Sequence, residues 1–189
     1  SMVLSISSRP HEGPCRSLVI AAGGGRDLAW PHQRVAAELL ARSGGRPVQR
    51  LFHGGARGAD AAIARAAHQL GWPAIALPAA WERHGRAAGP IRNRELLQLA
   101  IAEAMAHTSL MTATSVLVLA FPGGPGTASL VQQACRMASR SPVPLAVVEV
   151  SPSAGRWAVA EHFRREVATA SRSAATAATF LAEASPICR

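Results

Sequence analysis

Residues 115–127 read SVLVLAFPGGPGT, and this stretch decides the fold. An apolar run from Ser115 to Phe121 leads directly into a glycine-rich turn. Short apolar runs bounded by turn residues favour buried strands of a parallel sheet. Glycines after such a strand leave backbone N–H groups exposed at its carboxyl end. The stretch therefore predicts a buried strand, a tight turn and the start of a helix.

The same alternation continues outward in both directions. Further apolar runs lie at residues 17–22, 48–53, 73–78 and 144–150. Helical patterns separate the runs, at residues 31–42, 59–70, 93–107 and 127–139. Strands that alternate with helices are typical of βαβ units. We predict an α/β fold, a Rossmann-like three-layer sandwich with a mainly parallel sheet of at least five strands and an additional C-terminal helical segment.

A length of 189 residues with 49% hydrophobic content suits one sizeable core rather than two domains. We expect a flexible leader at residues 1–15 and the Rossmann-like domain at residues 16–150. An Ala-rich C-terminal helical extension of the same domain follows at residues 151–189. The connection at residues 78–90 is long for such a domain, and long loops are often functional.

Composition excludes several classes of protein. All 20 Lys and Arg residues are Arg, so a Walker phosphate loop and a Schiff-base lysine are both excluded. The three cysteines lack metal-ligand spacing, and we expect no metal, no cofactor and a reducing, cytoplasmic location. No apolar run approaches the roughly 20 residues of a membrane span, so we expect no membrane partner.

Three glycine-rich turns follow predicted strands, with the sequences GGGRD, HGGARGAD and FPGGPGT. Helix starts and free N–H groups converge at the carboxyl edge of a parallel sheet and bind anions there. The turns supply the following expected ligand-binding residues: Gly24, Gly25, Arg26, Gly54, Gly55, Ala56, Arg57, Gly58, Asp60, Pro122, Gly123, Gly124, Gly126 and Thr127. Asp60 is expected to cap the next helix or fix its loop rather than act as a base, and Thr127 to cap a helix or bind phosphate.

The segment GPIRNRE at residues 89–95 opens another helix. Arg92 and Arg94 are two residues apart and so diverge around the helix, which leaves one of them to face the pocket. Arg92, Asn93 and the nearby Trp81 complete the expected ligand-binding residues. Candidates for acid–base catalysis are Asp60, His84 and Glu95, although the sequence shows no carboxylate partner for His84.

The segments GGGRD, HGGARGAD, WERHGRAAGPIRNREL and AFPGGPGT together resemble the SLOG superfamily, in its YspA/YpsA-related branch. This resemblance implies a nucleotide-derived ligand and covers residues 17–150. The related LOG-type phosphoribohydrolases carry a glutamate where this chain has Leu130, and their helix-start arginine matches Arg92. The DNA-processing protein A family is similar through ARGAD and RNR, which implies single-stranded DNA as another ligand.

We therefore expect a domain that binds or senses a nucleoside monophosphate or an ADP-ribose-like molecule. The alternatives are a nucleoside 5′-monophosphate phosphoribohydrolase, which cleaves the N-glycosidic bond, and a single-stranded DNA-binding protein. Whether the chain is an enzyme stays open at this point. The lack of Tyr disfavours nucleic acid as the partner, because single strands bind to aromatic stacking platforms. The resemblance also implies a homo-oligomer, a dimer or higher.

Overall fold

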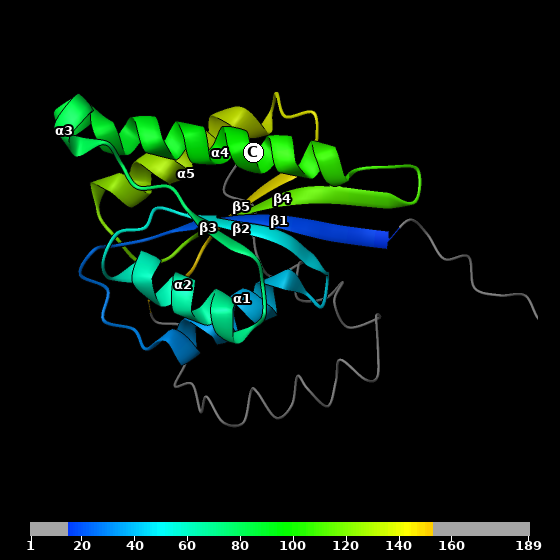
Figure 1. Cartoon of the computed structure of the whole chain (residues 1–189), viewed down its shortest axis with the longest axis horizontal. Helices are drawn as coiled ribbons and strands as arrows, with labels where there is room; N and C mark the ends of the chain where they lie inside the picture. The colour runs from blue at the N-terminus through cyan, green and yellow to red at the C-terminus, as the bar shows by residue number, and fades with distance from the viewer. Residues whose placement is uncertain (1–14, 153–189) are drawn as a thin grey trace, which may run out of the picture.

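The computed structural model describes residues 15–152 and contains a five-stranded parallel sheet between two pairs of helices (Figure 1). Its strands are β1 Cys15–Gly23, β2 Val48–His53, β3 Ala74–Ala76, β4 Thr112–Ala120 and β5 Leu145–Glu149. They lie in the order β3-β2-β1-β4-β5, and every neighbouring pair is parallel. The predicted α/β, Rossmann-like fold is confirmed. Most of the predicted leader and C-terminal extension lies outside the described residues.

Four helices form the outer layers. The helices α1 His32–Ser43 and α2 Ala59–Gln69 cover one face of the sheet, and α4 Ala88–His107 and α5 Pro125–Ala138 cover the other (Figure 1). Each was expected within a few residues, except that α4 begins five residues early, because Pro90 is tolerated in a first helical turn. Among residues 15–152, no helix is both long and apolar enough to cross a membrane.

The connection at residues 78–90 was expected to be a loop and is partly helical. It contains the short helix α3 Trp81–His84 and the 3₁₀ turn η1 Gly85–Ala87, which run directly into α4. Neither element has a buried residue, so no apolar periodicity marks them in the sequence.

The central strand β1 divides the core into two halves. Leu18 and Ile20 pack toward α1 and α2, whereas Val19 and Ala21 pack toward α4 and α5. This alternation follows from the two-residue period of a strand. Because both faces are covered, residues 18–22 of the strand are all apolar, within the apolar run that the sequence predicted.

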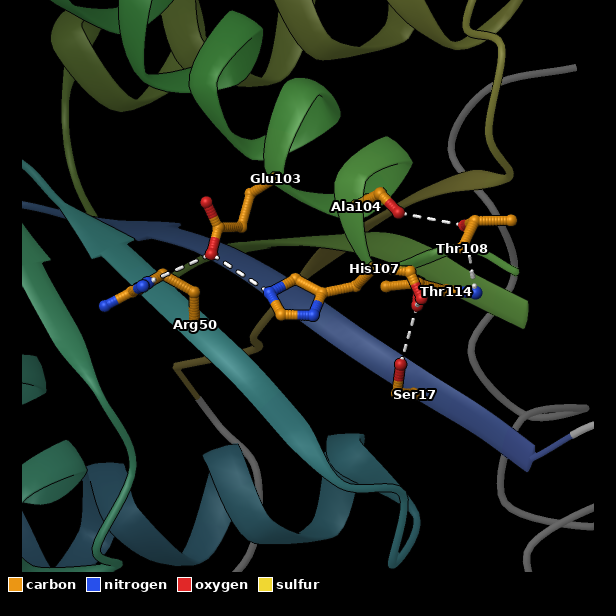
Figure 2. Close-up of polar contacts among 7 residues, drawn as sticks. All are labelled: Ser17, Arg50, Glu103, Ala104, His107, Thr108 and Thr114. Atoms are coloured by element: carbon orange, nitrogen blue, oxygen red, sulfur yellow. Dashed lines mark hydrogen bonds and ion pairs between the residues drawn. The ribbon is translucent and has the colours of Figure 1, made fainter. Parts of the chain in front are cut away.

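Polar contacts anchor the far end of α4 to the sheet (Figure 2). Glu103 of α4 accepts a hydrogen bond from Arg50 of β2 at 3.3 Å and lies 3.2 Å from the His107 ring. Next to them, the hydroxyl groups of Ser17 on β1 and Thr114 on β4 are 2.7 Å apart. These contacts fix one end of α4, which positions its other end beside the glycine-rich turns.

The chain order leaves a crevice at one edge of the sheet. From β1 the chain adds β2 and β3 on one side and then crosses to add β4 and β5 on the other. The carboxyl ends of β1 and β4 therefore lie at a topological switch point, where the following loops diverge and leave a crevice.

Candidate functional site

A cleft of about 670 Å³ lies at this switch point. Its walls come from the turns after β1, β2 and β4, from the start of α4 and from Trp81 of α3. It brings together most of the residues that the sequence singled out. Those that line it are Gly24, Gly25, Arg26, Gly54, Ala56, Asp60, Trp81, Arg92, Asn93, Pro122, Gly123, Gly124, Gly126 and Thr127.

Several expected residues do not line the cleft. Gly55 and Gly58 lie in the β2–α2 loop outside the cleft lining. Their positive φ values of 68° and 71° allow the loop to turn there. Arg57 is exposed and pairs instead with Asp27 at 3.1 Å. The candidate acid–base residues His84 and Glu95 are exposed and lie outside the cleft lining.

The turn after β1 packs directly against both of the other glycine-rich turns. The Gly25 N–H donates to the Pro122 carbonyl at 2.9 Å, and the Gly25 carbonyl accepts from Ala59 N–H at 2.9 Å. A Cβ atom on Gly24 would lie 2.6 Å from the Cβ of Ala59 and 2.8 Å from that of Phe121. These glycines are therefore required for the turns to approach each other, whether or not a ligand is bound.

The third turn has two glycines of a different kind. A Cβ atom on Gly124 or Gly126 would meet nothing within 4 Å, although both residues line the cleft. Gly124 is the N-cap of α5 and no side chain caps this helix, so the expected cap by Thr127 is not formed. The first N–H groups of a helix lack intrahelical partners and carry the positive end of its dipole. The start of α5 thus presents an open, positive surface to the cleft.

Arg92 and Asn93 hold the start of α4 against two of the turns. Arg92 Nη1 donates to the Gly54 carbonyl at 2.6 Å and to the Leu77 carbonyl at 3.2 Å. Asn93 Nδ2 donates to the Gly126 carbonyl at 3.1 Å. Burial lowers the pKa of Arg92, an effect that Asp60 opposes and Arg26 reinforces. Arg92 therefore uses part of its hydrogen-bonding capacity to position the loops. The sequence did not indicate this role.

Asp60 fixes its loop, as expected. Its Oδ2 accepts a hydrogen bond from Ala56 N–H at 3.2 Å, while the N-cap of α2 is Gly58. Asp60 is 4% exposed, and burial raises the pKa of its carboxyl group against the opposing effects of Ala56 N–H, Arg92, His53 and Gly54 N–H. Nearby, burial lowers the pKa of His53, whose Nδ1 accepts from Gly55 N–H and so belongs to the neutral ring.

A pair of side chains meets at the cleft from opposite sides. The Arg26 guanidinium lies over the Trp81 ring, 4.9 Å from its centroid. The far edge of the same ring packs near Gly89, where an added Cβ atom would be 3.4 Å away. Trp81 remains 46% exposed, so this large aromatic surface is available at the cleft.

Sequence reasoning missed some residues of the cleft wall. Those not expected as ligand contacts are Ala22, Gly23, Asp27, Leu28, Gly89, Leu96, Pro125 and Leu130. Leu96 lies four residues after Arg92 and so shares its helix face, a spacing that could have revealed it. Among residues 15–152 no cluster of His, Cys, Asp and Glu could hold a metal ion. Cys135 of α5 is disulfide-bonded and is therefore no free nucleophile.

Fold and cleft together define a Rossmann-like α/β protein whose glycine-rich turns meet at the switch point of its sheet. Residues 18–84 match the model of the YspA, cpYpsA-related SLOG family, the branch that the sequence motifs resemble. The matched segment contains the first two glycine-rich turns and Trp81.

Solved structures of two other proteins are similar to the chain. One is DNA processing protein A from Streptococcus pneumoniae, with a TM-score of 0.45 and 17% identity over 79% of this chain and 56% of that one. The other is the molybdenum cofactor binding protein from Rippkaea orientalis, with a TM-score of 0.43 and 14% identity over 82% of this chain and 85% of that one. The chain thus spans little more than half of the DNA processing protein. No curated protein matches the sequence.

Proposed function

We propose that this protein binds a nucleotide-derived small molecule, a nucleoside monophosphate or an ADP-ribose-like compound, in the cleft at the switch point. One observation carries the proposal: the open start of α5 faces the same cleft as Arg26, Arg92 and the exposed ring of Trp81. A nucleotide needs the same combination, an anion site beside an aromatic surface.

In the proposed complex the phosphate lies at the start of α5. Gly124 and Gly126 have no Cβ atom and leave room for it, and Thr127 offers a hydroxyl group. Arg26 and Arg92 balance its charge. The base stacks on Trp81, which replaces the contact between that ring and the Arg26 guanidinium.

An N-glycosidic hydrolase of nucleoside monophosphates is the second candidate. Leu130 is 3% exposed and lines the cleft where the phosphoribohydrolase motif has glutamate. The observation that favours hydrolysis is the buried carboxyl group of Asp60 in the same cleft, because glycoside hydrolysis depends on carboxyl groups. Single-stranded DNA is less favoured, since Trp81 is the one aromatic residue among those that line the cleft.

Calorimetric titration with AMP, GMP, CMP, UMP and ADP-ribose tests the proposal. We expect at least one compound to bind, and Arg26→Gln to weaken it about tenfold through the loss of a charged contact. Arg94→Gln is the matched control, because Arg94 is exposed and does not line the cleft. Chromatography of the same mixtures for free base separates binding from hydrolysis. Absence of binding by all five compounds refutes the proposal.

We also propose that the protein is a homo-oligomer. Exposed apolar side chains at the end of α4 and in the next loop support this, with Met105 at 51%, Leu110 at 99% and Met111 at 78% exposure. Light scattering after size-exclusion chromatography measures the mass directly, and a monomer at high protein concentration refutes the proposal.

For location we propose the cytoplasm, on the wide spacing and odd number of the cysteines. The disulfide at Cys135 stands against this proposal, since cytoplasmic thiols are mostly reduced. Thiol trapping in intact cells decides between the two: complete alkylation of Cys135 supports the cytoplasm, and protection of Cys135 refutes it.

A further inference from the structure

Asp60 is a carboxylate in the cleft wall, and one of its two oxygens accepts no hydrogen bond. Oδ2 accepts from Ala56 N–H, but Oδ1 is buried and has no hydrogen-bond partner. We infer that Asp60 Oδ1 accepts a hydrogen bond from a sugar hydroxyl group of the ligand, so that the cleft selects sugar phosphates over phosphates without hydroxyl groups. This inference rests on the proposed function, because it requires the phosphate at the start of α5.

A buried carboxylate oxygen without a hydrogen-bond partner lowers the stability of the folded protein. Buried polar groups are almost always paired, and an unpaired one destabilises the fold unless a bound partner satisfies it. Asp60 is only 4% exposed, so bulk water does not compensate Oδ1. The free protein therefore holds an acceptor ready for a ligand, and a complex that supplies a donor gains the bond without having to strip water from it.

The negative charge of Asp60 limits which part of a ligand can bind to it. A carboxylate repels phosphate, so the anion of the ligand belongs at the start of α5 and not at Asp60. The aromatic surface for a base is at Trp81. What remains for Asp60 is the part of a nucleotide that joins phosphate to base, which is the sugar with its hydroxyl donors.

The place of Asp60 fits this assignment. A Cβ atom on Gly23, at the end of β1, would lie 4.0 Å from Asp60 Oδ1 and 3.0 Å from Leu130 Cδ2. Oδ1 and the Leu130 side chain thus flank the same backbone position, between the first and third turns. Rotation about the terminal torsion of an aspartate is easy, and in the proposed complex this rotation turns Oδ1 toward the ligand.

The other carboxylate of the cleft wall already has a charged partner. Asp27 has a side chain that is 91% exposed and is paired with Arg57 at 3.1 Å. An exposed carboxylate with an arginine partner gains little from a further donor. Asp27 is therefore a matched control, since it lines the same cleft with the same functional group.

The test compares ribose 5-phosphate with methyl phosphate by calorimetric titration. Both are phosphate monoesters of the same charge, and only the first has hydroxyl groups. For the unmodified protein we expect ribose 5-phosphate to bind about tenfold more tightly, as one charge-assisted hydrogen bond predicts. In Asp60→Asn the preference falls to about threefold, because a neutral amide replaces the carboxylate, and in Asp60→Ala it disappears. Methyl phosphate binds both variants at least as well as before, since a negative charge has been removed, and Asp27→Asn keeps the preference.

Equal binding of the two compounds by the unmodified protein overturns the inference, whatever the variants do. A preference that persists in folded Asp60→Ala, with folding verified by circular dichroism, also overturns it. If the unmodified protein binds neither compound, the phosphate site at the start of α5 is refuted and the inference falls with it, whereas the proposed function is judged separately by the titration with the five nucleotides. Binding of both without preference leaves the phosphate site standing and removes only the role of Asp60.

Discussion

Replacing Arg92 by Met should reveal how much of the cleft depends on a single guanidinium group. Methionine retains an unbranched, apolar stem but can donate no hydrogen bond. The substitution removes the bonds from Nη1 to the Gly54 carbonyl at 2.6 Å and to the Leu77 carbonyl at 3.2 Å. It also removes the bond from Nε to Asn93 Oδ1 at 3.1 Å.

The expected loss follows from these contacts. A hydrogen bond from a charged donor contributes about 1.5–3 kcal/mol, but two of the three share one nitrogen atom and are not additive. Arg92 is half-buried, so water reaches part of the site after the substitution. The loss of a positive neighbour also makes the buried Asp60 carboxylate less stable. We expect the free energy of unfolding to fall by about 2–4 kcal/mol.

Urea denaturation followed by circular dichroism measures this difference. Arg94→Met is the control, because Arg94 lies on the same helix, is exposed and does not line the cleft. Its effect should stay within about 0.5 kcal/mol. If Arg92→Met with an unchanged m-value loses less than about 1 kcal/mol relative to this control, Arg92 does not hold the loops together. The positioning role assigned to it would then be wrong.

Four further outcomes test other parts of the structure. Asp60→Asn should stabilise the protein increasingly as the pH rises above 3.8, because burial raises the folded-state pKa and ionisation then opposes folding; a stability difference that is flat with pH contradicts this. Gly126→Ala should leave the free energy of unfolding unchanged or raise it by up to about 1 kcal/mol while it weakens phosphate binding, since its methyl group meets open space in the cleft. Gly25→Ala should instead destabilise the fold in thermal melts, because its Cβ atom would lie 2.9 Å from Gly123 Cα, and equal melting temperatures for the two alanine variants would refute the distinction. Adding AMP should change the emission of the unmodified protein but not of Trp81→Leu, because this exposed ring lines the cleft; an identical change in both assigns the signal to another tryptophan.

Much of this protein was determined by the sequence itself. A strand segment buried on both faces is apolar at every position, so the run at residues 116–120 of β4 could be recognised in the sequence, and β2 has the predicted bounds. Parallel strands place their carboxyl ends at one edge, which is why turns 100 residues apart, those at Gly24 and Gly124, were expected in one site. That expectation needed only periodicity and the positions of the glycines.

Tertiary structure decided what each residue of the site does. Glycines look alike in a sequence, yet Gly24 is required by the contact between turns, whereas Gly126 borders open space. Arg92 was expected to face an anion and also ties two loops together. Ala56 N–H bonds one carboxylate oxygen of Asp60, and the fold leaves the other buried without a partner near the end of β1. Such differences arise from contacts between segments distant in the chain, and local sequence patterns carry no record of those contacts.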